Sequence, residues 1–134
     1  MVKDVKLAKE IVVAQKNKVG ILANISKVLA DAGINIHGVA GYAVDNDVKI
    51  MLVTEDNLRA TDALKKSGYE SVKENEVVVA ELINKPGALK SFTAKLAAEG
   101  IDMKYIYGAV CSKGCPGTIA VSYTHLTLPT KRIV

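Results

Sequence analysis

The spacing of apolar residues in the first part of the chain changes from strand-like to helix-like and back. A short β-branched run over residues 11–14 predicts a strand. Apolar residues then recur every three or four positions, which is the spacing of one helix face. They are Ile21, Ile25, Val28, Leu29 and Ala32. Gly33 follows, where a left-handed residue would end such a helix.

The next segments predict a hairpin, a second helix and a weaker strand. Residues 34–44 are expected to be extended, with apolar side chains on one side of the pleat: Ile34, Ile36, Ala40, Tyr42 and Val44. Residues 45–47 predict a tight turn, so that strand 48–53 returns antiparallel. Asp56 is expected to cap a helix whose apolar face carries Leu58, Thr61 and Leu64. Gly68 ends that helix, and residues 69–72 start a fourth strand.

The chain then repeats this order of elements. Asn17-Lys18-Val19-Gly20-Ile21-Leu22 recurs as Asn84-Lys85-Pro86-Gly87-Ala88-Leu89, an offset of 84 − 17 = 67 residues. The same offset relates residues 33–36 to 100–103 and Gly41 to Gly108. Chance rarely gives several matches in register, so the sequence predicts an internal duplication. The second copy is expected to have a strand over 77–83, a helix over 87–99 with Leu89, Phe92 and Leu96 inward, and a final strand over 118–121.

The predicted fold class is α+β, with two ferredoxin-like βαββαβ repeats that form antiparallel sheets. The first repeat is placed at residues 1–76 and the second at 77–134. The second is expected to be truncated after about residue 121, because residues 122–134 contain Pro129 and have no helical periodicity.

Composition and charge exclude several classes of function. Hydrophobic residues make up 49% of the 134 residues, enough for a packed core, and the single Phe and absent Trp leave that core to aliphatic residues. The net charge of +4 comes from lysines and arginines scattered among acidic residues, so nucleic acid is not expected as a partner. No stretch is apolar for long enough to span a membrane, and the start lacks a signal-peptide pattern, so we expect a cytoplasmic protein.

The turn and helix motifs resemble those of the ACT domain. The resemblance is a strand, then Asn-Lys-Pro-Gly-Ala-Leu, then a helix ending in Gly-Ile-Asn-Ile, and it covers both repeats from about residue 10 to 121. The layout is similar to small stand-alone tandem ACT proteins, some of which carry names taken from the regulatory subunit of acetolactate synthase. The resemblance implies an amino-acid-binding regulatory protein with no catalytic centre and no cofactor.

The end of the chain looks different in kind. Residues 122–130 resemble a translated sequencing adapter, which suggests that the natural second repeat continued with a helix and a strand. The other interpretation is a natural tail in which the alternation over 123–128 extends the last strand.

The glycine turns are the candidate ligand site. Gly20 and Gly87 have no Cβ, and the N–H groups at the start of the helices that follow suit a carboxylate. Asn35 and Asp102 would accept from an ammonium group. In serine-binding ACT domains the ligand contacts match Gln15, Asn17 and Asn35, although Gln15 stands where the serine-binding form has His. The full expected set is Gln15, Asn17, Val19, Gly20, Ile21, Asn35, Ile36, Asn84, Gly87, Ala88, Leu89 and Asp102.

The same residues also have a purely architectural interpretation. A glycine turn before a helix often serves packing alone, and Asn17 and Asn84 are suited to hydrogen bonds within their own turns. The second site is expected to be weaker, because Leu82 stands where the first has Gln15.

No motif in the sequence indicates an enzyme or a metal site. His37 has no second histidine or carboxylate at metal spacing, and His125 lies in the unusual tail. Cys111 and Cys115 bracket a loop and lack two further zinc ligands; we expect free thiols, with a loop disulfide as the alternative.

Two functions remain open from the sequence. The first is an amino-acid-binding regulator with its ligand where two ACT units meet. The second is an interaction module, or a regulatory subunit that pairs with a biosynthetic enzyme without a small molecule. The exposed sheet edges of ferredoxin-like units favour a homodimer in either case.

Overall fold

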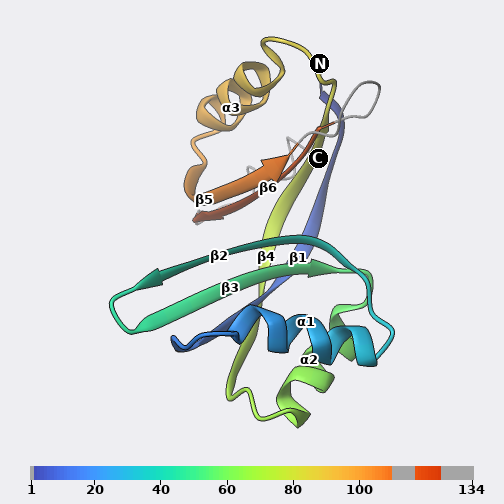
Figure 1. Cartoon of the computed structure of the whole chain (residues 1–134). Coiled ribbons are helices and arrows are strands. Elements are labelled where there is room, and N and C mark those ends of the chain that lie inside the picture. Colours follow the sequence, from blue (N-terminus) through green and yellow to red (C-terminus); the bar gives the residue numbers. More distant parts are fainter. Residues whose placement is uncertain (1, 110–116, 125–134) are drawn as a thin grey trace. The chain divides into compact units, whose positions relative to one another are not determined.

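The structure, a computed structural model, describes residues 2–109 and 117–124 (Figure 1). The predicted helices and strands are present, except that the two strands expected at 69–72 and 77–83 form one continuous strand. In chain order they are β1 (Val2–Lys16), α1 (Ile21–Asp31), β2 (Ile36–Val44), β3 (Asp47–Thr54), α2 (Asn57–Lys66), β4 (Ser71–Leu82), α3 (Ala88–Ala98), β5 (Asp102–Ala109) and β6 (Gly117–Thr124). The fold is α+β and of the ferredoxin-like βαββαβ type, as predicted.

The six strands are ordered β2-β3-β1-β4-β6-β5, and the contacts divide the chain into two compact units. The central unit is Lys9–Asn75. The terminal unit joins residues 1–8 to the chain from residue 76 onward, as far as the structure describes it. The sequence boundary at 76/77 lies beside the structural one, but residues 1–8, expected in the first repeat, group with the second.

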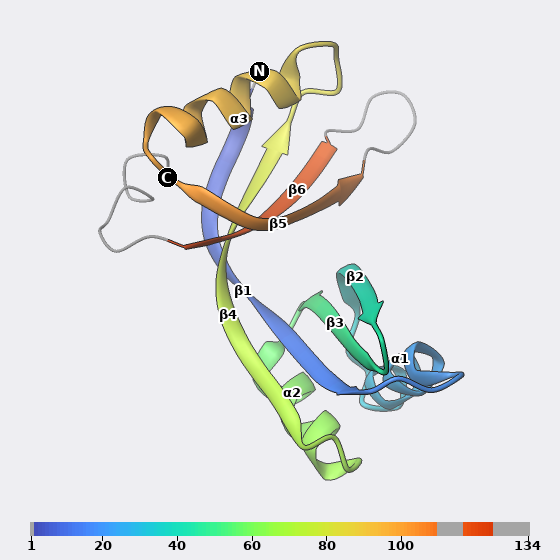
Figure 2. The ribbon, with the colours of Figure 1, turned by 90° about the vertical axis from the view of Figure 1, so that its left-hand side faces the viewer.

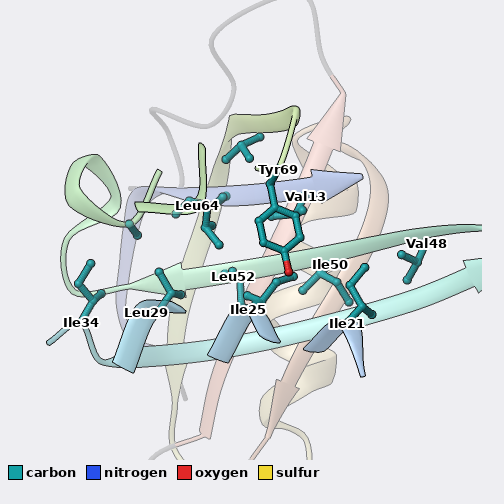
Figure 3. Packing of buried hydrophobic residues seen from close by; sticks show 13 residues of the cluster. Val13, Ile21, Ile25, Leu29, Ile34, Val48, Ile50, Leu52, Leu64 and Tyr69 are labelled. Carbon is teal, nitrogen blue, oxygen red and sulfur yellow. The ribbon is translucent and has the colours of Figure 1, made fainter. Parts of the chain in front are cut away.

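The central unit contains a complete βαββαβ arrangement. Its sheet has the order β2-β3-β1-β4, with β3 antiparallel to both β1 and β2. Helices α1 and α2 cover one face of this sheet, because each has one apolar stripe to bury. Figure 3 shows Ile21, Ile25 and Leu29 of α1 facing the β3 side chains, and all three are buried. The predicted inner face of α1 is therefore confirmed.

A β-bulge in β2 overturns the predicted facing of that strand. Ile36 pairs with Thr54 and Gly38 with Val53, so the ladder shifts by one residue at His37. A one-residue shift moves every later side chain to the other face. Past the bulge, Val39 pairs with the buried Leu52 and thus points to the helix side. Ala40, Tyr42 and Val44 point to the opposite face, not to the face of Ile36 as the alternation predicted.

Strands β1 and β4 are longer than predicted, and each belongs to both units. The sequence predicted a strand at 11–14 and separate strands at 69–72 and 77–83, whereas β1 runs over Val2–Lys16 and β4 over Ser71–Leu82. Within the terminal unit the sheet order is β1-β4-β6-β5, so residues 2–8 of β1 take the edge place beside β4 (Figure 2). Val5 packs against the core of that unit.

Helices α2 and α3 bury partly different residues from those predicted. On α2 the buried residues are Ala60 and Leu64, whereas Leu58 is 82% exposed. On α3 they are Ala88, Phe92 and Leu96, whereas Leu89 is 51% exposed. In both helices the buried stripe begins one residue or more away from the first leucine, because the turn before the helix sets its rotation about its axis.

Other predicted local signals are confirmed. The Asp56 carboxylate caps α2 by accepting a hydrogen bond from the N–H of Arg59 at 3.1 Å. Gly33 has φ +73° after the end of α1.

Strand β6 differs from the prediction, since it extends to Thr124, past the predicted end at 121. The predictions for Cys111, Cys115 and His125 lie outside the described residues. Among the described residues, no helix has the length and apolar character needed to cross a membrane.

We predict that Tyr69→Phe lowers the free energy of unfolding by about 1 kcal/mol at neutral pH, since a partly buried hydrogen bond is lost. The Tyr69 hydroxyl donates to Oδ1 of Asn24 at 2.5 Å, and its ring lies within the central core. Burial raises the pKa of Tyr69 above its usual value of 10.0. The folded state therefore holds this proton more tightly, so the contribution is complete below pH 10 and falls as the pH rises further.

Chemical denaturation of both proteins at several pH values tests this. The difference between wild type and Tyr69→Phe is expected to shrink above pH 10. Tyr42→Phe is the control, because Tyr42 is half-exposed and on the sheet edge. A constant difference across the alkaline range would contradict the prediction.

We also predict that deletion of residues 1–8 loosens the terminal unit and spares the central one. The deletion removes the strand beside β4 and the packing of Val5. Hydrogen exchange of amides in residues 76–82 is expected to speed up at least about tenfold. Amides of β3 serve as the internal control and should keep their protection. Unchanged exchange over residues 76–82 would show that residues 1–8 do not support this unit.

Candidate ligand-binding site

The first group of predicted site residues lies where β1 ends and α1 begins. The backbone N–H of Asn17 donates to the carbonyl of Asn46 at 2.7 Å, which fixes this turn against the β2–β3 hairpin. Val19 is fully exposed, and Gly20 has φ +86°. No side chain caps α1, so the N–H groups of its first turn have no side-chain acceptor at the N-cap position. This geometry suits an anion such as a carboxylate.

The equivalent turn of the terminal unit has the same backbone shape. Gly87 has φ +89°, and no side chain caps α3. The N–H of Ala88 already donates to the carbonyl of Lys85 at 3.2 Å, and Ala88 itself is buried. Leu82, which stands where the central unit has Gln15, is buried in the terminal core. The central turn therefore offers more polar groups to a ligand than the terminal one.

Asn35 and Ile36 lie at the far end of α1 from Gly20. Helix α1 has 11 residues, and a rise of about 1.5 Å per residue makes it roughly 16 Å long. An amino acid is far shorter than that. A single ligand therefore cannot contact both Asn17 and Asn35 of the same unit. Asp102 follows the end of α3 in the same way, away from Gly87.

The end of α1 that carries Asn35 is closed by contacts within the protein. The N–H of Asn35 donates to Oε1 of Glu55 at 2.9 Å, and its carbonyl accepts from the N–H of Glu55 at 3.1 Å. The guanidinium of Arg59 donates to the carbonyl of Ala32. Ile36 packs against the central core. Asn35 itself is exposed, so its side chain can meet another molecule.

An apolar groove lies beside the open end of α1, and the sequence did not predict it. Its volume is about 390 Å³, and it runs between α1 and the edge strand β2. The residues that line it are Leu22, Val39, Ala40, Gly41, Tyr42, Ala43, Val48 and Ile50. None of these belongs to the predicted set. The small residues of β2 were the available signal, but the bulge at His37 hid which of them face the helix.

Two predicted residues adjoin this groove. Gln15 pairs with Val48, and Val48 pairs with Ala43, so the three share one cross-strand row on the helix side of the sheet. Ile21, the first residue of α1, precedes Leu22 and is buried. The structure thus brings Gln15, Asn17, Gly20 and Ile21 to one end of α1, together with the groove.

The described residues contain no group of three His, Cys, Asp or Glu side chains that could hold a metal ion. His37 is exposed at the bulge of β2.

Comparisons with known proteins agree with this fold. Residues 9–66 match the sequence model of the ACT domain. These residues lie within the central unit and include the turn at Asn17 and the groove. No curated protein matched the chain.

Three solved structures have the same fold over most of this chain. Protein BT0572 from Bacteroides thetaiotaomicron has 25% identity and a TM-score of 0.80, and the match covers 90% of this chain and 82% of that one. The ligand-free regulatory subunit of aspartate kinase from Thermus thermophilus has 15% identity and a TM-score of 0.66 over 90% and 87% of the two chains. A structure of aspartokinase alpha and beta subunits has 18% identity and a TM-score of 0.62 over 99% and 96%. The last two likenesses are of fold.

We predict that Gly20→Ala destabilises the protein through its backbone alone, by about 1–2 kcal/mol. The left-handed φ of Gly20 disfavours any Cβ, while no atom lies within 4 Å of the place where that Cβ would be. Gly20→Asn should lose less, because asparagine tolerates this conformation better. Chemical denaturation measures both changes. Equal stability of Gly20→Ala and wild type would show that the turn before α1 relaxes out of the left-handed conformation.

Proposed function

We propose that this protein is an amino-acid-binding regulator that acts in the cytoplasm and has no catalytic role. The observation that carries the proposal is the open start of α1, where uncapped N–H groups and Asn17 meet an apolar groove. A zwitterion with a side chain needs this combination of anion donors and apolar surface. The ACT domain match over the same residues supports it.

The ligand site is proposed to be composite. One ACT unit supplies the turn with Gln15, Asn17, Val19, Gly20 and Ile21, and another supplies Asn35 and Ile36 from the opposite end of its α1. The length of α1 supports this, because it separates the two groups within one unit. The corresponding terminal group is Asn84, Gly87, Ala88, Leu89 and Asp102. The composite site accounts for the proposed homodimer, since a second copy supplies the missing half.

Regulation would follow from a ligand site that two units share. A ligand that contacts both units stabilises their association and so shifts the population towards one arrangement. A biosynthetic enzyme is the proposed recipient of that change. The fold shared with a regulatory subunit of aspartate kinase supports a partner of this kind.

We further infer that the two units descend from one duplicated ACT unit. The matching φ angles of Gly20 and Gly87 and the matching bulges after Ile36 and Met103 support the duplication.

The exposed apolar residues on the edge strand β2 favour a second candidate function, that of an interaction module. Val39, Tyr42 and Val44 are each about half-exposed beside unpaired backbone of the outermost strand. An interaction module that pairs this edge with an enzyme subunit, without a small ligand, would use the same surface.

A screen of the twenty amino acids by thermal unfolding tests the first function, with calorimetry on any that stabilise. A ligand at a hundred times its Kd is expected to add about 2.7 kcal/mol to the free energy of unfolding. Asn17→Ala should weaken its binding at least about tenfold, because a hydrogen bond to a charged group is lost. Asn75→Ala is the matched control, since Asn75 is exposed on β4.

If no amino acid raises the unfolding temperature, the proposed function is wrong. Capture of a biosynthetic enzyme without ligand would then support the interaction module.

A further inference from the structure

We propose that Asn57 is a latch between strands β1 and β3, and that it couples the Asn35 end of α1 to the place where β1 enters the central unit. The side-chain amide of Asn57 takes the place of one hydrogen bond of the sheet. The connecting segment that carries it, residues 54–57, is bonded to both β1 and Asn35. Neither the repeat nor the glycine turns of the sequence indicated Asn57.

The paired part of β1 and β3 ends beside Asn57. Ile11 pairs with Leu52, and the same register carried two residues further would place Lys9 opposite Thr54. One carboxamide bridges these two residues instead. The N–H of Thr54 donates to Oδ1 of Asn57 at 3.3 Å, and Nδ2 of Asn57 donates to the carbonyl of Lys9 at 2.9 Å. The amide of Asn57 thus acts as an inserted peptide group that gives both backbone groups a partner.

The bridge has an alternative that satisfies the same backbone groups. If Asn57 withdraws, the N–H of Thr54 can donate directly to the carbonyl of Lys9 and extend the ladder. Asn57 is only partly buried, so water can solvate its amide when it withdraws. Lys9 is the first residue of the central unit, so the latch decides how β1 is held at its entry. Two discrete arrangements of one element are what a conformational switch requires.

The other side of the connecting segment holds the Asn35 end of α1. The N–H of Glu55 donates to the carbonyl of Asn35 at 3.1 Å, and Oε1 of Glu55 accepts from the N–H of Asn35 at 2.9 Å. The hydroxyl of Thr54 donates to Oδ1 of Asn57 at 2.6 Å and accepts from the N–H of Asp56 at 3.2 Å. Each residue of the segment takes part in these bonds, so a displacement of Asn35 is passed on to Asn57.

This coupling gives the proposed regulator a route from Asn35 to the strand that both units share. That use of the latch rests on the proposed function, because Asn35 belongs to the proposed half-site. The latch and its coupling to Asn35 do not depend on a ligand, and the full chain without ligand is sufficient to test them.

NMR on Asn57 variants tests the latch. In Asn57→Ala the bridging amide is gone, and a scalar coupling across the hydrogen bond from the Thr54 nitrogen to the Lys9 carbonyl carbon is expected to appear. Asn57→Asp keeps the acceptor for Thr54 and loses the donor to Lys9, and a carboxylate in the first turn of α2 is compatible with folding. It should shift the Lys9 carbonyl signal and keep Thr54 amide exchange within about threefold of wild type.

Hydrogen exchange in Glu55 variants tests the coupling. Glu55→Ala removes the acceptor of the Asn35 N–H and should speed exchange of the Thr54 amide at least about fivefold, while Glu55→Gln, which keeps an acceptor, should restore most of the protection. Asp62→Asn is the matched control. Asp62 lies on α2, and its carboxylate contacts Lys66 at 3.1 Å outside the connecting segment, so the Thr54 amide should exchange as in wild type.

Two results would overturn the inference. Absence of the coupling between Thr54 and Lys9 in Asn57→Ala would make Asn57 a fixed cap of the ladder and not a latch. Unchanged exchange of the Thr54 amide in Glu55→Ala would show that the two sides of the connecting segment are independent. Because both measurements are made without ligand, they leave the proposed amino-acid binding to its own screen.

Discussion

The burial of one face of α1 on the central sheet is the interaction on which the rest of the central unit depends. Ile25 and Leu29 are completely buried against Leu52 of β3 and Ile11 and Val13 of β1. Fully burying a side chain of this size contributes about 1.5–3 kcal/mol. Once this face is fixed, the two ends of the helix are fixed as well. The start of α1 must then lie at the β2–β3 hairpin, and its end must lie at the β3–α2 connection.

The fixed position of α1 separates the candidate site residues into two groups, one at each end of the helix. The turn at Asn17 and Gly20 stays open at one end, while Glu55 and Arg59 occupy the backbone groups at the other. Had α1 been a single turn long, one unit could have held a ligand alone. Its actual length of 11 residues keeps the two groups apart, so in the proposed composite site the open turn is one half. In the composite site proposed above, association between units is therefore a requirement of binding rather than an addition to it.

The sequence predicted those features that depend only on residues close to one another along the chain. The helix periods, the Asp56 cap and the left-handed glycines are local, since each is decided within one turn of chain. The strand ends and the bulge were not predictable in this way. Strand β1 extends back to Val2 because β4 lies beside it, and β4 is more than fifty residues distant in sequence. Residues 2–8 contain no alternation strong enough to show that a distant strand would pair with them.

The bulge at His37 shows how one non-local feature decides the site. The alternation in β2 put Tyr42 and Val44 on the face of Ile36, and with that register the helix side would carry a large aromatic ring. The shift at His37 instead turns Gly41 and Ala43 towards α1. Small residues there leave the sheet edge uncovered, so packing that larger side chains would provide is lost.

The same bulge recurs between Met103 and Tyr105 of β5, before Gly108. At Gly108 a Cβ would meet the carbonyl of Thr118 at 2.6 Å, so that glycine is required by the strand pairing itself. At Gly41 the nearest atom is the flexible end of Ile50, so pairing alone requires glycine less strictly there. At both glycines the place of the missing Cβ is thus taken by atoms of the neighbouring strand, so the packing of the sheet accounts for both.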